Sequence, residues 1–286
     1  MTPTALAYLL CFVSAVTVAA VGFLIKRGGD VLVARSVMSF GMGLTALPFA
    51  FVVPLPPVEI IPAFTLAVAV HWVYQTAMIS ALHRGDLSMV FPVMRGLGPL
   101  MAGIFAVFVL QETFSPAGWL GLTLASAAVI VFALPAGKTD GQRAIDRSAL
   151  FFAGLTAVGI GAYTVTDAYV IRQLPKPETF IVWLFLIDWI GVAVIAVIRR
   201  WGRLAESYRP VVRDGLIGGV VGAISYAAAL YAFTLIDAAL VAALRETSII
   251  FAALMGAIWL KEGFGIRRVA AAATMACGLL MMQVFG

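Results

Sequence analysis

The chain has 286 residues, of which 63% are hydrophobic and only 12% are charged, and its formal net charge is +5 at pH 7. With a mean hydropathy of +1.05, it has too little polar surface to cover a water-soluble globule of this length. The composition therefore excludes a soluble domain and indicates a protein whose solvent is mostly lipid.

Apolar stretches of about 18 to 25 residues, long enough to cross a hydrocarbon core, recur along the whole chain. Because they are continuous rather than alternating, they exclude a membrane β-barrel. The first stretch follows no basic segment and no clear cleavage site follows it, so we predict a retained helix rather than a signal peptide. The ten stretches that we predict to be membrane helices are 4–25, 31–53, 60–82, 87–110, 116–134, 148–171, 179–198, 214–235, 238–259 and 265–284.

Two distant segments of the chain are similar to each other. Residues 95–114 and 245–264 share Arg, Leu, Glu and Phe at a shift of 150 residues, and one further apolar stretch follows each of them. This similarity predicts an internal duplication. The expected parts are a first five-helix repeat at 1–137, a cytoplasmic linker at 138–147 and a second five-helix repeat at 148–286.

The basic residues predict how the repeats cross the membrane. Fourteen of the 19 Lys and Arg residues lie in loops that follow odd-numbered stretches or, for Arg267 and Arg268, in the first few residues after such a loop, and only two lie in loops that follow even-numbered ones. Cytoplasmic loops carry the excess of Lys and Arg, so the odd loops are expected in the cytoplasm and both termini outside. Since five is odd, the second repeat is inverted. The basic residues that raise the pI to about 9.5 then serve as an orientation signal and do not indicate a nucleic-acid partner.

The duplication places Glu112 and Glu262 in equivalent positions at the ends of apolar stretches. In an inverted repeat these two carboxylates face opposite membrane surfaces, which excludes a catalytic pair. We therefore predict that both are structural helix ends. Each is expected to meet donors from a loop or a neighbouring helix at the membrane interface, where its charge stays partly solvated.

The ten stretches, the duplication and the two Leu-x-Glu-x-Phe helix ends at 110–114 and 260–264 resemble the drug/metabolite transporter superfamily, in its ten-helix EamA type. Among these proteins the chain is most similar to bacterial exporters of aromatic amino acids. The resemblance implies an all-α carrier of the bacterial inner membrane, with two inverted five-helix repeats around a central cavity. It departs from the four-helix members in lacking an acid in its first helix, so their proton-coupling mechanism cannot be carried over.

Proline usage differs between the two repeats. The fourth stretch contains Pro92 and Pro99, whereas the equivalent positions of the ninth stretch are Ala242 and Ile249. Because proline bends or breaks a helix, we expect the two halves to bend differently.

Ionisable side chains at membrane depth are few, and such residues usually face a partner or a wet cavity. Arg95 and Arg245 are both expected near the midplane, each about 12 Å into its helix at about 1.5 Å per residue. Either one binds a substrate carboxylate, or each is neutralised within the helix bundle by an acid such as Glu246 or Asp188. The sequence leaves both interpretations open.

A strip of polar and aromatic residues follows one face of the third helix at spacings of three and four residues. We predict that it faces Tyr163 and Asp167 across the transport path, although such a strip is also typical of helix packing. The full set of residues expected to line the cavity is His71, Trp72, Tyr74, Gln75, Met78, Arg95, Tyr163, Asp167, Ser225, Tyr226, Arg245 and Glu246.

These features predict a secondary transporter that exports small amphipathic metabolites, aromatic amino acids first. The alternative is a broad extruder of drugs or organic cations, with Asp167, Asp188 or Glu246 as the counter-charge. An intramembrane enzyme or a non-transporting scaffold fits less well, and no catalytic residues are expected. Two isolated cysteines and two histidines predict no metal site, no cofactor is expected, and the absence of a Walker motif excludes ATP hydrolysis. The expected partners are a small-molecule substrate and the lipid bilayer, and the sequence is compatible with a monomer.

Overall fold

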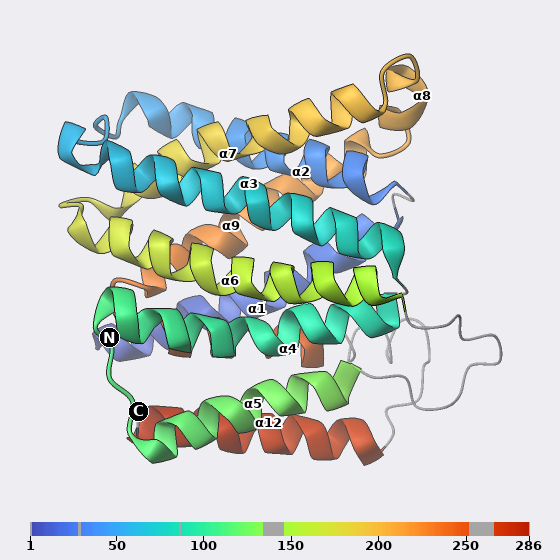
Figure 1. Cartoon of the computed structure of the whole chain (residues 1–286). Coiled ribbons are helices and arrows are strands. Elements are labelled where there is room, and N and C mark those ends of the chain that lie inside the picture. The colour runs from blue at the N-terminus through green and yellow to red at the C-terminus, as the bar shows by residue number, and fades with distance from the viewer. Residues whose placement is uncertain (1, 28–29, 86, 134–145, 252–265, 286) are drawn as a thin grey trace. The chain divides into compact units, whose positions relative to one another are not determined.

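A computed structural model describes residues 2–27, 30–85, 87–133, 146–251 and 266–285, which form helices and connecting turns with no strand among them (Figure 1). Within these ranges, seven helical segments are long and apolar enough to cross a membrane, and α5 and α12 supply two shorter apolar ones. The α-helices are α1 (Pro3–Arg27), α2 (Val31–Ala46), α3 (Ile61–Arg84), α4 (Leu87–Phe105), α5 (Pro116–Ala133), α6 (Arg147–Gln173), α7 (Pro177–Arg199), α8 (Leu204–Tyr208), α9 (Val212–Ala232), α10 (Ala238–Arg245) and α12 (Ile266–Phe285).

Short polar residues start several of these helices. The Asp30 carboxylate accepts hydrogen bonds from the first free N–H groups of α2, Ser115 accepts one at the start of α5, and Asp146 accepts one at the start of α6. Such caps satisfy backbone donors that have no partner inside the helix. They fix where each apolar segment begins.

The chain divides into two compact units, each built from two separate segments. Unit 1 contains Met1–Trp72 and Thr166–Leu235, and unit 2 contains Val73–Val165 and Ile236–Gly286. Helices α3 and α6 therefore contribute residues to both units. In unit 1, α9 packs against α1 and α2, and α2 also packs against α7.

Glycines allow α2 and α9 to pack with their backbones in contact. A Cβ atom built on Gly219 would lie 2.6 Å from the Cα atom of Gly41, which is closer than two non-bonded carbon atoms can approach. The neighbouring Gly218 faces only the flexible Met38 side chain, 3.6 Å away, and Leu24. The close approach therefore depends on Gly219.

Gly219→Ala is expected to destabilise unit 1 by about 2 kcal/mol, because the two helix backbones must separate. Gly218→Ala is the matched control. It places the same methyl group in ordinary contact distance and removes a helix-weakening glycine, so it is expected to be neutral or slightly stabilising. Thermal unfolding of both variants in detergent tests this difference. Equal melting temperatures would contradict it.

In unit 2, α5 and α12 pack against each other (Figure 1). A Cβ atom on Gly121 would lie 2.6 Å from the carbonyl oxygen of Gly278, so this pair also packs through glycine. Buried Leu122, Val129 and Met275 belong to the apolar cluster that joins these helices to α10. Helix α4 packs against α5 and α10.

The predicted span 238–259 is not one continuous helix in the described residues. Helix α10 ends at Arg245, residues 246–247 form a turn, and residues 248–251 are helical again. The N–H groups of Glu246 and Thr247 bond three residues back instead of four, and the Thr247 hydroxyl donates to the Leu244 carbonyl. The proline-free segment is therefore broken, whereas α4 continues past Pro92 and Pro99.

Asp30 also joins two helix ends in unit 1. Its carboxylate lies 2.8 Å from the Nε atom of Arg200, at the end of α7. Partial burial works to raise the pKa of Asp30, but the hydrogen bonds from Arg200 and from the Val33 and Leu32 N–H groups outweigh it and hold this pKa below its usual value.

A carboxyl group whose pKa is lowered in the folded protein stabilises the fold at pH values above its ordinary pKa of about 4. That stabilisation is lost as the pH falls through the pKa that the group has in the folded protein. Because the pair is still partly solvated, we expect Asp30→Asn to cost only about 0.5 kcal/mol at pH 7. The asparagine can still cap α2. Denaturant unfolding of the wild type and Asp30→Asn should show this difference at pH 7 and a smaller one near pH 3. A difference that grows on acidification would contradict the account.

Candidate functional site

Unit 1 contains a buried polar trio formed by His71 of α3, Asp167 of α6 and Tyr226 of α9. The Asp167 Oδ2 atom lies 2.9 Å from His71 Nε2 and accepts a hydrogen bond of 2.5 Å from the Tyr226 hydroxyl. The Tyr226 hydroxyl is also 3.4 Å from His71 Nε2. Three helices that are distant in sequence thus converge on one carboxylate oxygen. The Asp167 side chain is fully buried.

The neighbours of the trio hold it in position. The indole N–H of Trp72 donates to the Asp188 carbonyl at 2.9 Å, which ties α3 to α7, and the Phe185 ring lies against Tyr226. The Ser225 hydroxyl donates to the Ser14 carbonyl at 2.9 Å and ties α9 to α1. Ser225, which directly precedes Tyr226 in the chain, therefore contacts α1.

Unit 2 contains a second group, which we call the charge–aromatic cluster: Arg95, Glu246, Ser248, Tyr74 and Tyr163. Arg95 Nε lies 2.9 Å from Glu246 Oε2, and Arg95 Nη2 donates to the Ser248 hydroxyl at 2.9 Å. The Glu246 side chain is 6% exposed and that of Arg95 is 21% exposed. The guanidinium thus spans the turn after α10.

The aromatic part of this cluster comes from α3 and α6. The rings of Tyr74 and Tyr163 have centroids 4.9 Å apart and meet edge to face, and the Tyr74 hydroxyl donates to the Met78 sulfur. Arg95, Arg245 and Glu246 act electrostatically on the buried Tyr163 hydroxyl. Unit 2 therefore combines a cation, an anion and two aromatic rings in one region.

Most of the predicted cavity residues fall into these two groups. The structure pairs His71 with Asp167 and Tyr74 with Tyr163, and it buries Gln75 completely. Trp72 and Ser225 instead connect helices, and Arg245 forms the last residue of α10. Sequence reasoning missed Ser248. Its signal was its position three residues after Arg245, one helical turn along the same segment.

Glu112 occupies a different kind of site in unit 2. Its Oε1 atom accepts a 2.9 Å hydrogen bond from the N–H of Ala238, the first residue of α10. Gln111, with φ of 59°, ends the preceding π-helical turn (Ala106–Leu110). Glu112 is buried rather than partly solvated as expected. Its equivalent, Glu262, lies outside the described residues.

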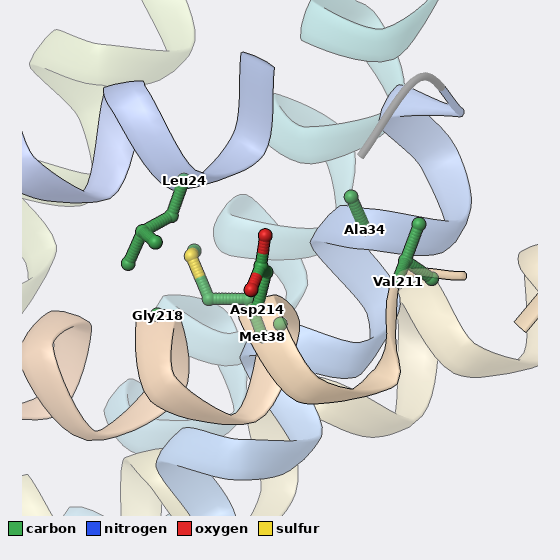
Figure 2. Close-up of a pocket in the computed structure, with 7 residues that line it drawn as sticks. Leu24, Ala34, Met38, Val211, Asp214 and Gly218 are labelled. Atoms are coloured by element: carbon green, nitrogen blue, oxygen red, sulfur yellow. The ribbon is translucent and has the colours of Figure 1, made fainter. Parts of the chain in front are cut away.

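A small pocket in unit 1 is lined by none of the residues of the trio or of the charge–aromatic cluster. Figure 2 shows the Asp214 carboxylate between Leu24 of α1 and Ala34 of α2, with Met38 beside it. Its volume of about 10 Å³ holds about one water molecule, so it is too small for a metabolite. In the described part of the chain, no three His, Cys, Asp or Glu residues are grouped as metal ligands.

Comparison with known proteins finds a family match in the second half of the chain. Residues 147–284 match the EamA-like transporter family. A solved structure described only as "Crystal structure of protein" has a TM-score of 0.74 to this chain at 17% identity, over 96% of this chain and 95% of that one. This likeness shows a shared fold. No curated protein matches the chain.

Proposed function

Because residues 147–284 form a domain of the EamA-like transporter family, within the drug/metabolite transporter superfamily, we propose that the chain is a secondary transporter that exports aromatic amino acids and similar small amphipathic metabolites. The family match and the apolar helices indicate a multi-pass membrane transporter. The substrate class is our inference from the charge–aromatic cluster.

The observation that supports this substrate class is the combination of groups in unit 2. An aromatic amino acid carries a carboxylate, an ammonium group and a ring. Arg95 complements the carboxylate, Glu246 complements the ammonium, and the Tyr74–Tyr163 pair offers a surface for the ring. The zwitterion would exchange ion-pair partners with Arg95 and Glu246, so no buried charge is left unpaired. A substrate with only one charge cannot do this.

Competition binding to the purified protein tests this proposal. We expect phenylalanine and tyrosine to compete well, and 2-phenylethylamine and 3-phenylpropionate, which lack the carboxylate and the ammonium respectively, to compete at least about tenfold less. Equal competition by 2-phenylethylamine and other organic cations would instead support a cation extruder. The position of Asp167 argues against a cation site there, because its carboxylate is fully buried and holds His71 and Tyr226.

Tyr74→Ala is expected to weaken the binding of aromatic amino acids about fivefold more than that of small aliphatic ones, equivalent to about 1 kcal/mol of ring contact. Tyr169→Ala is the control, since Tyr169 is an exposed aromatic residue of the same helix as Tyr163. Parallel titrations with phenylalanine and alanine measure the ratio. A uniform loss for both substrates would mean that Tyr74 only packs the helices.

We also propose the inverted-repeat architecture and the orientation in a bacterial inner membrane with both termini outside. Two helix pairs support the repeat: α2 packs against α7, and α5 packs against α12. In each pair the partners are equivalents between the two predicted repeats, as expected around a pseudo-two-fold axis.

Cysteine labelling of intact cells tests the orientation. In a background lacking Cys11 and Cys277, Thr2→Cys is expected to react with an impermeant reagent and Trp201→Cys is not. Trp201 is 79% exposed, and it is preferable to its neighbour Gly202, whose φ of 86° disfavours a side chain. Labelling of Trp201→Cys alone would reverse the orientation.

A further inference from the structure

We propose that His71, Asp167 and Tyr226 form a proton-binding site that couples transport to a pH gradient. This inference rests on the proposed transporter function, and it concerns unit 1 rather than the charge–aromatic cluster.

The geometry places one carboxylate in an environment that favours proton binding. Both donors of the trio converge on Asp167 Oδ2, and Asp167 Oδ1 has no hydrogen-bond partner among the described residues although it is buried. A buried carboxylate with an unsatisfied oxygen at membrane depth is costly. One bound proton neutralises the trio and lowers that cost.

The charge balance of the site is simple. With one exchangeable proton on His71, the imidazolium and the Asp167 carboxylate sum to zero, and when that proton leaves, the trio carries one negative charge. No covalent bond other than N–H or O–H changes. Tyr226 donates to Asp167 and lies 3.4 Å from His71 Nε2, so it keeps the pair aligned.

The surrounding helices add two charges of opposite sign. Arg35 of α2 and Asp188 of α7 both act electrostatically on His71. Because these two charges compensate each other, the proton on the trio decides whether the region is neutral or negative. A change of one charge in a buried site is large enough to bias one helix arrangement over another.

Transport driven by a pH gradient tests the coupling. For one proton exchanged per substrate, a gradient of one pH unit sustains a concentration ratio of up to about tenfold. We expect wild-type proteoliposomes with an acidic lumen to accumulate labelled phenylalanine toward this ratio. In Asp167→Asn the ratio is expected to fall to about one, while exchange of labelled for unlabelled substrate at equal pH continues. Asp146→Asn, the same change at the exposed start of α6, is expected to behave as the wild type.

Gradient-driven accumulation that persists in Asp167→Asn would overturn the proposal. If the wild type neither exchanges nor accumulates phenylalanine, the substrate proposal fails, and proton binding is then decided by a measurement that needs no transport. The chain has only two histidines, so His83→Gln leaves His71 as the single histidine signal in a nitrogen-15 NMR titration.

We expect the His71 signal to titrate in one transition, and Asp167→Asn to move the midpoint by about one pH unit or more. Tyr226→Phe is expected to move it less, because it removes one neutral donor and leaves the carboxylate in place. A His71 signal that does not titrate, or a midpoint unchanged by Asp167→Asn, would show that the trio only locks α3, α6 and α9 together.

Discussion

Arg95→Gln is expected to lower the free energy of unfolding by about 3 to 5 kcal/mol, because it leaves the buried Glu246 carboxylate without the cation that contacts it directly. The pair is held at 2.9 Å, with Glu246 almost inaccessible to solvent. The same change removes the guanidinium that donates to Ser248 across the turn after α10. We therefore expect this substitution to loosen the broken segment as well as the ion pair.

The double variant Arg95→Gln/Glu246→Gln separates ion pairing from packing. Two neutral amides leave no unpaired charge, so the double variant is expected to recover part of the stability lost in Arg95→Gln. Arg84→Gln is the control, because Arg84 is an exposed arginine that donates to a helix carbonyl at the end of α3. Thermal and denaturant unfolding in detergent measure all three. A double variant that is no more stable than Arg95→Gln alone would contradict the ion-pair account.

Glu112→Ala is the second substitution with a large expected effect. It leaves the N–H of Ala238 without its buried acceptor and removes a negative charge from the positive end of α10. Together these losses are expected to cost about 3 kcal/mol. The measurement is the unfolding free energy and the amount of protein that reaches the membrane.

Glu112→Gln distinguishes the hydrogen bond from the charge. Its amide oxygen can still accept from Ala238, so it is expected to lose about 1 kcal/mol. Glu178→Ala is the control, since Glu178 is an exposed acid in the first turn of α7. If Glu112→Gln reached the membrane in full amount but lost all transport, a direct role in transport would replace the structural one.

Hydropathy predicted the positions of the long helices well, because the requirement to cross a hydrocarbon layer acts on each segment separately. Predicted 60–82 and 179–198, for example, correspond to α3 and α7. The break at residues 246–247 could not be predicted in this way. The segment around this break has partners from distant parts of the chain, namely Arg95 for Glu246 and Glu112 for the start of α10.

The candidate site shows the same division. The spacing of His71, Tyr74 and Gln75 along one helix predicted a common face, since such periodicity is local. Sequence alone could not show that His71 contacts Asp167 whereas Tyr74 contacts Tyr163. These two contacts depend on how α6 packs against α3. Nor could it show that Arg95 already has a carboxylate partner.

Counterflow in proteoliposomes tests the central claim, that the chain transports aromatic amino acids, most directly. Vesicles containing the purified protein are loaded with unlabelled phenylalanine and diluted into a trace of labelled phenylalanine. A secondary transporter for this substrate is expected to concentrate the label transiently inside, in the absence of any ion gradient, and unlabelled tyrosine outside should suppress the signal. Uptake equal to that of protein-free vesicles, for phenylalanine, tyrosine and tryptophan alike, would contradict the claim.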